Sequence, residues 1–329
     1  MKYTRLGNTG LEVSRICLGC MSFGDDTAGV TTGKGWALNE ESSREIIKRA
    51  LDLGINFFDT ANTYSGGTSE VFTGHALRDF ANRDEIVVAT KVYFPVEKAG
   101  HNLQGLSRKN IMKSIDDSLM RLGMDYVDLY QIHRWDYQTP IEETMEALND
   151  VVKAGKARYI GASSMYAWQF AKAQQVAKEH GWSRFVSMQN LYNLIYREEE
   201  REMIPLLADQ KVGQMVWSPQ AKGRLARKPG TVTTRYENEA VGKRFFPEDE
   251  SNLEIIRRVE KVAEDKGIPM GQVALAWLLS KPTVTSPIVG ATKIRHLEEA
   301  CGAVDVVLTP EEITYLEEAY LPHAITGHN

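Results

Sequence analysis

Short apolar runs, rich in β-branched and aromatic residues, alternate with longer segments of helical period along nearly the whole chain. Such alternation is typical of a parallel sheet wrapped by helices. Eight runs have this character: Ile16–Gly19, Asn56–Asp59, Ile86–Thr90, Val127–His133, Ala157–Gly161, Phe185–Gln189, Gln214–Trp217 and Ser286–Val289. Eight units predict an (α/β)8 TIM barrel. No break in composition divides the chain, so we expect one domain over residues 1–329.

The segments between these runs have the spacing of covering helices. From Arg108 onward the apolar residues recur at steps of four, four and three, at Ile111, Ile115, Leu119 and Leu122. That spacing places them on one stripe of a helix, which predicts that the helix packs against the barrel.

The N-terminal residues have a different pattern from the barrel units. Lys2–Leu6 and Leu11–Arg15 flank the turn-rich sequence Gly7-Asn8-Thr9-Gly10. Two short strands around such a turn predict a β-hairpin, which we expect to close the bottom of the barrel.

Further helices and two irregular stretches are predicted beyond the basic units. Extra C-terminal helices are expected at Asn252–Lys266 and Met270–Ser280, and a last one after Thr309, where Pro occupies the first helical position. The stretches Gly24–Leu38 and Lys222–Glu250 are rich in Gly, Thr and charge, and each follows a strand. Loops in that position border the active site of such barrels, so we expect both to be lids.

Charge and composition restrict the class of partner. The formal net charge is −5 with a pI near 5.9, and the basic residues are scattered, which disfavours a nucleic-acid partner. Met1–Arg5 lacks the apolar core of a signal peptide, and no apolar run approaches the roughly 20 residues that span a bilayer. We therefore expect a cytoplasmic protein without a membrane partner.

The three cysteines include one C-x-x-C pair. Cys17 and Cys20 lie in or just after an apolar strand, without a second such pair or a nearby pair of histidines, and Cys301 is distant in sequence. We expect buried, reduced thiols rather than a redox centre, and no metal site.

Four polar residues follow or end three neighbouring strands. Asp59 ends the second run, Lys91 follows the third, His133 closes the fourth, and Tyr64 lies in the loop after Asp59. The carboxyl ends of barrel strands carry the chemistry of this fold, so these side chains are predicted to meet. An ammonium beside a phenol favours the phenolate, so Lys91 is expected to lower the Tyr64 pKa and make Tyr64 a general acid for carbonyl reduction.

The surrounding motifs resemble a known family. The segment Gly54–Ser65 is similar to the G-x-x-x-F-D-T-A-x-x-Y signature of aldo-keto reductases, and further matches lie at Gly19–Gly24, Ser118–Asp128 and Gly155–Ser164. The resemblance implies that Asp59, Tyr64, Lys91 and His133 are the catalytic group. It also implies a nicotinamide cofactor as hydride donor, most often NADPH, and a small carbonyl compound as substrate. It is strongest to a branch with bacterial reductases linked to 1-deoxyxylulose 5-phosphate formation and fungal reductases of the versiconal hemiacetal acetate type.

The resemblance also places the cofactor. The chain has no G-x-G-x-x-G between a strand and a helix, which disfavours a Rossmann site. By resemblance, Ser163 and Gln189 hold the nicotinamide carboxamide, and Trp217 stacks on the nicotinamide ring. The residues that the resemblance assigns to the pyrophosphate and adenosine parts of the cofactor are Ser218, Gly223, Arg224, Gly290, Thr292, Lys293, His296 and Glu299. Lys293 would neutralise a 2′-phosphate, which favours NADPH. His296 and Ala300 stand where many relatives have Gln and Asn, so we expect one adenine contact to be lost.

Substrate identity is the least determined feature. Met21, Tyr93, Phe94 and Trp135 follow strands and could form an aromatic pocket wall or pack beneath loops. Aromatic or small aldehydes are the expected substrates. Sugars and sugar phosphates remain an alternative, because the lid residues Arg235, Lys243 and Arg244 could meet a phosphate or face water.

Two other functions are compatible with parts of the pattern. Potassium-channel β subunits share the fold of the resembled family, so a cofactor-sensing regulatory subunit is one alternative. The other is a barrel aldolase in which Lys91 forms a Schiff base. Asp59 beside Lys91 disfavours the aldolase, because a nearby carboxylate keeps an ammonium charged.

Overall fold

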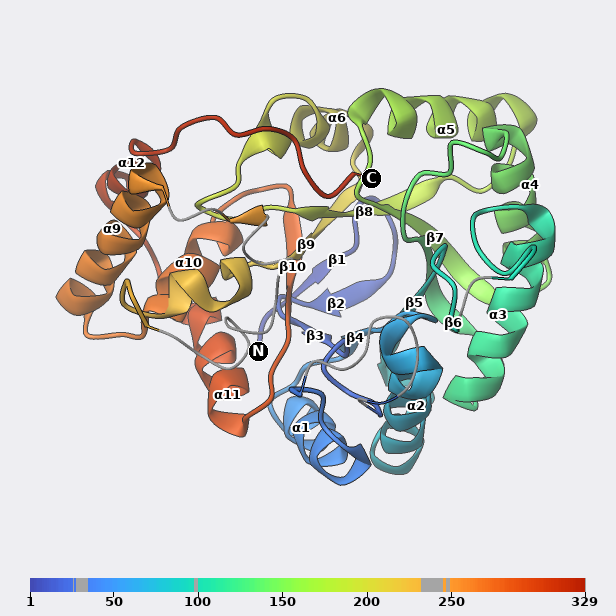
Figure 1. Ribbon diagram of the computed structural model, residues 1–329, viewed down its shortest axis with the longest axis horizontal. Coiled ribbons are helices and arrows are strands. Elements are labelled where there is room, and N and C mark those ends of the chain that lie inside the picture. Colours follow the sequence, from blue (N-terminus) through green and yellow to red (C-terminus); the bar gives the residue numbers. More distant parts are fainter. Residues whose placement is uncertain (26, 28–34, 98–99, 232–244, 247–248, 329) are drawn as a thin grey trace.

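Eight parallel strands close into a barrel, as the alternation of apolar runs predicts (Figure 1). The computed structural model describes residues 1–25, 27, 35–97, 100–231, 245–246 and 249–328. Around the barrel the order of strands is β10-β3-β4-β5-β6-β7-β8-β9. Their bounds are β3 Cys17–Gly19, β4 Phe57–Asp59, β5 Val87–Val92, β6 Val127–Ile132, β7 Ala157–Ser163, β8 Phe185–Leu191, β9 Gly213–Trp217 and β10 Val284–Val289.

Helices surround the barrel and cover its outer face (Figure 1). The helices between successive strands are α1 Glu40–Asp52, α2 Thr68–Phe80, α3 Arg108–Leu122, α4 Ile141–Lys153, α5 Ala167–His180 and α6 Met203–Gln210. In α3 the side chains of Ile111, Ile115 and Leu122 are fully buried, and Leu119 is half-buried and packs against the same core, which confirms the predicted stripe. Buried apolar area of this kind is the main driving force of the fold.

The predicted C-terminal helices are confirmed. They are α9 Glu250–Lys266, α10 Met270–Leu279 and α12 Pro310–Glu317, while α11 Ile294–Gly302 is the helix that follows β10. Helix α12 begins with a capping box, in which Thr309 Oγ1 accepts from Glu312 N at 3.2 Å and Glu312 Oε2 accepts from Thr309 N at 2.8 Å. These reciprocal bonds satisfy backbone donors that a helix start otherwise leaves open.

The N-terminal hairpin lies across the amino end of the barrel. Its strands β1 (Tyr3–Arg5) and β2 (Glu12–Ser14) pair antiparallel, and Figure 1 shows them inside the ring of barrel strands. Leu6 and Val13 join a buried cluster with strand residues of the barrel interior. Gly7 has a φ of +57°, and a Cβ there would come within 2.6 Å of Gly213 N, so only glycine permits this approach.

The lid prediction is only partly within the described residues. Of the two stretches, residues 26, 28–34, 232–244 and 247–248 lie outside them. The described ends of the first stretch pair with each other, since Phe23 and Leu38 form a parallel bridge. The second stretch begins with the 3₁₀ helix η4 (Ala221–Ala226), in which Lys222 and Gly223 have positive φ.

Candidate active site

The four predicted residues meet at the carboxyl end of the barrel. Lys91, on β5, donates from Nζ to Asp59 Oδ2 on β4 at 2.6 Å and to the Tyr64 hydroxyl at 3.3 Å. Tyr64 lies at the start of the 3₁₀ helix η1 (Tyr64–Gly67), and its ring centroid is 5.9 Å from that of His133, which directly follows β6. Three strands and one loop thus bring an ammonium, a carboxylate, a phenol and an imidazole into one cluster.

Asp59 is held by more than Lys91. Its Oδ1 accepts from Gln131 Nε2 at 3.0 Å and from Gln189 Nε2 at 2.9 Å, while Lys91 Nζ also donates to Thr60 O at 2.8 Å. Asp59 and Lys91 are 2% and 0% exposed, so neither is solvated by bulk water. A buried ion pair is tolerable only when further hydrogen bonds satisfy both ions, as they do here.

Lys91 stays protonated in this setting. Burial lowers its pKa, but the charges and hydrogen bonds of Asp59 and Tyr64 outweigh burial, so the pKa is raised above its ordinary value. A Schiff-base lysine needs a depressed pKa to supply a free amine at neutral pH. The aldolase alternative therefore has no support in this geometry.

The expected change in the Tyr64 pKa is wrong in direction. Burial raises the pKa of Tyr64, and Asp59 raises it further, whereas Lys91 lowers it by less than the two together. Loss of water disfavours the phenolate before any neighbour acts on it. Tyr64 is consequently protonated at neutral pH, which is the form that a proton donor requires.

His133 is a neutral imidazole at neutral pH. Burial lowers its pKa well below the ordinary range, and the cations of Lys91 and Arg134 lower it further. Its Nδ1 is buried without a hydrogen-bond partner in the described part of the chain. Buried polar atoms without a partner are rare and costly, and they mark positions where a ligand can complete the hydrogen bonding.

The residues predicted to hold a nicotinamide surround the same end of the barrel. Ser163, the last residue of β7, donates from Oγ to Gln189 O at 2.8 Å, while the Gln189 side chain is turned toward Asp59. Trp217, the last residue of β9, is half-buried, and its Nε1 donates to Ser164 Oγ at 2.9 Å. The indole is therefore fixed at the strand end with part of its surface open, which suits a stacking partner.

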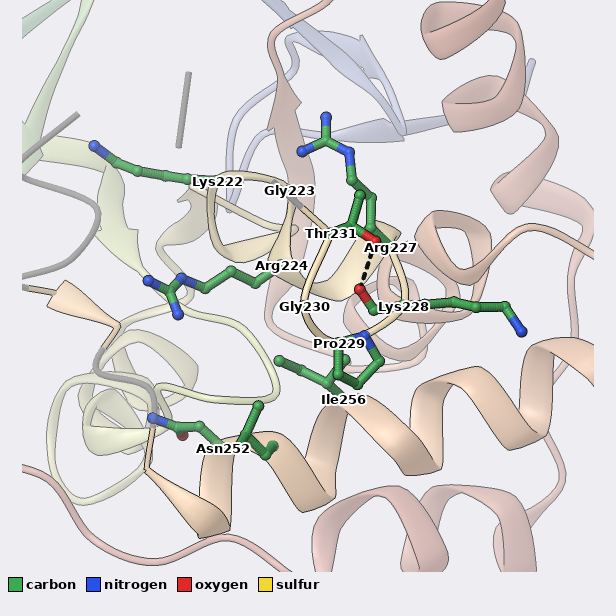
Figure 2. Close-up of a pocket in the computed structure, with 11 residues that line it drawn as sticks. Lys222, Gly223, Arg224, Arg227, Lys228, Pro229, Gly230, Thr231, Asn252 and Ile256 are labelled. Carbon is green, nitrogen blue, oxygen red and sulfur yellow. Dashed lines mark hydrogen bonds between the residues drawn. The ribbon is translucent and has the colours of Figure 1, made fainter. Parts of the chain in front are cut away.

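A cavity rich in basic residues lies in the segment that follows Trp217 and β9 (Figure 2). It is formed by η4, the segment after η4 and the start of α9, and its lining residues are Lys222, Gly223, Arg224, Arg227, Lys228, Pro229, Gly230, Thr231, Asn252, Leu253 and Ile256. Figure 2 shows Lys222 and Arg224 extending to the same side, with Lys228 pointing to the other. Two of the predicted pyrophosphate residues, Gly223 and Arg224, thus lie in a region whose charge suits phosphates.

The predicted adenosine end lies between β10 and α11, and none of its residues lines that cavity. Gly290 and Lys293 are exposed, and Thr292, His296 and Glu299 are half-buried. Arg227 lies near both regions. Its Nη1 would be 3.0 Å from a Cβ added to Gly223. Burial lowers the pKa of His296, and the charge of Arg227 makes a smaller contribution in the same direction.

Ser218, predicted to hold the cofactor, makes a hydrogen bond through its backbone in this structure. Its carbonyl oxygen accepts from Asn193 Nδ2 at 3.0 Å. A positive φ of 51° at Ser218 begins the bend that leads from β9 into η4.

The aromatic residues after β5 and β6 divide into two groups. Phe94 packs edge-on against His133 with ring centroids 5.0 Å apart, and Tyr93 packs against Phe94 at 5.0 Å. Trp135 is 7% exposed and lies against Trp168, which indicates packing beneath the loops rather than a pocket wall. Met21 is 37% exposed. The predicted phosphate ligands Arg235, Lys243 and Arg244 lie outside the described residues.

Several site residues were not found by sequence reasoning. Gln131 anchors Asp59, Ser164 fixes Trp217, and Arg134 and Arg227 add cations at either side of the site. Gln131 was detectable, since it lies two residues before His133 on the same face of β6.

The cysteines have the predicted buried environment. Cys17 and Cys20 are fully buried free thiols, and burial raises the pKa of Cys20 to about 12. A reactive or metal-binding cysteine needs accessible thiolate, so the C-x-x-C pair has the properties of core residues. In the described part of the chain, no helix is long and apolar enough to cross a bilayer.

Comparison with known proteins gives one consistent result. Residues 15–321 match the model of the aldo/keto reductase family. Versiconal hemiacetal acetate reductase of Aspergillus parasiticus is 48% identical, with 99% of this chain and 98% of the relative aligned. A candidate aryl-alcohol dehydrogenase of Saccharomyces cerevisiae is 42% identical over 98% of both chains. An aldo-keto reductase of Fusarium vanettenii is 44% identical over 99% of this chain and 93% of the relative.

Proposed function

Because the chain belongs to the aldo/keto reductase family, whose members act on carbonyl and alcohol groups, we propose that it reduces aldehydes or ketones with NADPH, using Tyr64 as general acid. The observation that carries the proposal is the buried cluster of Lys91, Asp59 and Tyr64 beside a neutral His133. Small aromatic aldehydes are the proposed substrates, in line with the aryl-alcohol dehydrogenase name of one relative.

Each residue of the cluster has a separate task in this proposal. Tyr64 donates its hydroxyl proton to the carbonyl oxygen, and the phenolate that remains lies 3.3 Å from Lys91 Nζ. Lys91 stabilises that new negative charge, and Asp59 keeps Lys91 in place. His133, as neutral imidazole, offers a hydrogen bond that fixes the direction of the carbonyl oxygen.

The residues present fit a dinucleotide. Trp217 offers a half-open indole face, the buried Nδ1 of His133 has no partner in the described chain, and the cavity in the segment after β9 carries Lys222, Arg224 and Arg227. When bound, NADPH supplies the hydride that the carbonyl carbon receives. Ser163 and Gln189 are the proposed holders of its carboxamide. Lys293, at the N-terminus of α11, is the proposed partner of its 2′-phosphate.

The acid role is tested with Tyr64→Phe. Removing the proposed proton donor is expected to lower kcat about 10²- to 10⁴-fold on benzaldehyde, because general acid catalysis contributes about that much. Binding of NADPH, followed by quenching of tryptophan fluorescence, should remain within about twofold of wild type. Full activity of the Tyr64→Phe protein would refute the mechanism.

The cofactor preference is tested with Lys293→Gln. Wild type should have a higher kcat/KM for NADPH than for NADH. In the variant, kcat/KM for NADPH should fall about tenfold while kcat/KM for NADH stays unchanged, because one exposed phosphate contact is removed. Equal kcat/KM values for the two cofactors in wild type would refute the role of Lys293.

A further inference from the structure

Arg134 is a half-buried cation beside the catalytic residues. It directly follows His133, and its charge lowers the pKa of both His133 and Tyr64. Its guanidinium carbon lies 5.6 Å from the ring centroid of Phe94, which itself packs on His133. Arg134 is therefore part of the wall from which the proposed general acid and His133 face a substrate.

The guanidinium has few partners of its own. Nη1 donates to the backbone oxygen of His133 at 2.6 Å, and Nε is buried without an acceptor. Across the described ranges, no carboxylate forms an ion pair with Arg134. Arginine has five N–H donors, and a buried charge without a counter-ion is costly. Burial lowers the Arg134 pKa, as expected for a cation that lacks a compensating anion.

The position of Arg134 separates it from the proposed cofactor site. It lies after β6, beside the residues that follow β5, whereas Ser163 and Trp217 end β7 and β9, and Lys293 follows β10. The other cation of the cluster, Lys91, is already paired with Asp59 at 2.6 Å. Among the residues of this wall that the structure describes, Arg134 is thus a cation without a carboxylate partner.

We infer that Arg134 determines substrate specificity by binding a carboxylate carried by the carbonyl substrate. The inference rests on the proposed function and deepens it, because it makes aromatic aldehydes with an acid group the preferred class. A planar carboxylate fits the planar guanidinium, and the aromatic rings of Phe94 and Tyr93 suit the rest of such a molecule.

A carboxylate fits this wall better than a phosphate ester does. A phosphate monoester carries close to two negative charges at neutral pH. Here one guanidinium is available, and it stands against aromatic rings that cannot solvate a second charge. The single positive charge of Arg134 therefore matches a monoanion.

The experiment compares acids with their neutral methyl esters. Wild type, Arg134→Gln and Arg134→Lys would be assayed with 3- and 4-formylbenzoate, with the two methyl esters, and with 4-formylphenyl phosphate. Arg134→Gln should lower kcat/KM for at least one acid about 10- to 100-fold, mainly through KM, and should lower kcat/KM for the matching ester at least about fivefold less. Arg134→Lys should retain part of the preference, because it keeps the charge but not the planar fork.

The matched control is Arg184→Gln, an exposed arginine at the amino end of β8, which should not change the ratio of acid to ester. Equal losses on acid and ester in both Arg134 variants would refute the role of Arg134 and leave the reductase intact. If kcat/KM of the Arg134 variants fell more for 4-formylphenyl phosphate than for the formylbenzoates, the choice of a carboxylate would be refuted. Wild-type protein that reduces neither acids nor esters would refute the proposed function itself.

Discussion

Replacing Asp59 with Asn tests the buried cluster most directly. The substitution keeps the size of the side chain but removes the charge that Lys91 contacts at 2.6 Å, and it leaves Gln131 and Gln189 facing a neutral amide. Lys91 is 0% exposed, so water cannot replace the lost anion. Breaking one partner from a buried pair costs about 3–5 kcal/mol, because the other charge remains buried. We expect a loss of unfolding free energy in that range at neutral pH.

The pH dependence of that loss follows from the Lys91 pKa. In wild type the folded pKa is raised, so the stabilisation is complete below the unfolded value of about 10.4 and is lost as pH rises through the folded pKa. Without Asp59 the largest remaining effect on Lys91 is burial, which lowers the folded pKa. The unfolded chain then binds more protons, so the stability of Asp59→Asn should increase with pH up to about pH 10.

The assay is urea unfolding followed by tryptophan fluorescence at about pH 7 and pH 9. The double variant with Asp59→Asn and Lys91→Met serves as the control, because it removes both charges and should recover part of the loss at pH 7. A loss below about 1 kcal/mol for Asp59→Asn, with no change between the two pH values, would refute the reasoning.

Three further predictions concern the acid and the fold. Because Tyr64 has a raised pKa and His133 a lowered one, kcat for reduction should be constant from about pH 6 to about pH 9, without an inflection near the ordinary histidine value. Gly74→Ala should destabilise the protein by about 1–3 kcal/mol, since its Cβ would lie 2.1 Å from Leu122 O. Thr309→Ala removes the N-cap of α12 and should cost about 1 kcal/mol in thermal or urea unfolding.

Each of these has its own check. An inflection of the kcat profile near pH 6.5 would contradict a neutral His133. Gly10→Ala is the matched control for Gly74, because the nearest atom to its Cβ is 3.6 Å away and belongs to a side chain. For Thr309, Ser at the same position keeps the capping oxygen and should unfold like wild type, so a full loss with Ser would contradict the capping role.

The strands could be located from sequence because parallel strands are buried on both faces. Such strands appear as continuous apolar runs, and all eight runs correspond to barrel strands. The predicted strand ends were less accurate where the strand includes polar residues. Lys91 was placed just after its run, yet β5 continues to Val92, because Asp59 satisfies the ammonium inside the barrel. Similarly β10 begins at Val284, before the buried Ser286.

The site could be predicted in part. Asp59, Lys91 and His133 end or follow neighbouring strands, and the fold then brings them together. The direction of the Tyr64 pKa could not be predicted, since it depends on how completely the folded chain excludes water from that phenol. Arg227 was missed for a related reason, because its proximity to His296 is created by the path of the chain after η4.

The raised pKa of Tyr64 is compatible with the proposed acid role. Catalysis depends on interactions that strengthen as charge develops, not on charge present in the resting protein. At rest the phenol is neutral, and its proton is available throughout the physiological range. As the proton leaves, the phenolate forms 3.3 Å from an ammonium that is already positioned and already desolvated. Asp59 opposes the phenolate but holds Lys91 charged, so in the proposed mechanism the cluster keeps Tyr64 protonated until a carbonyl oxygen accepts its proton.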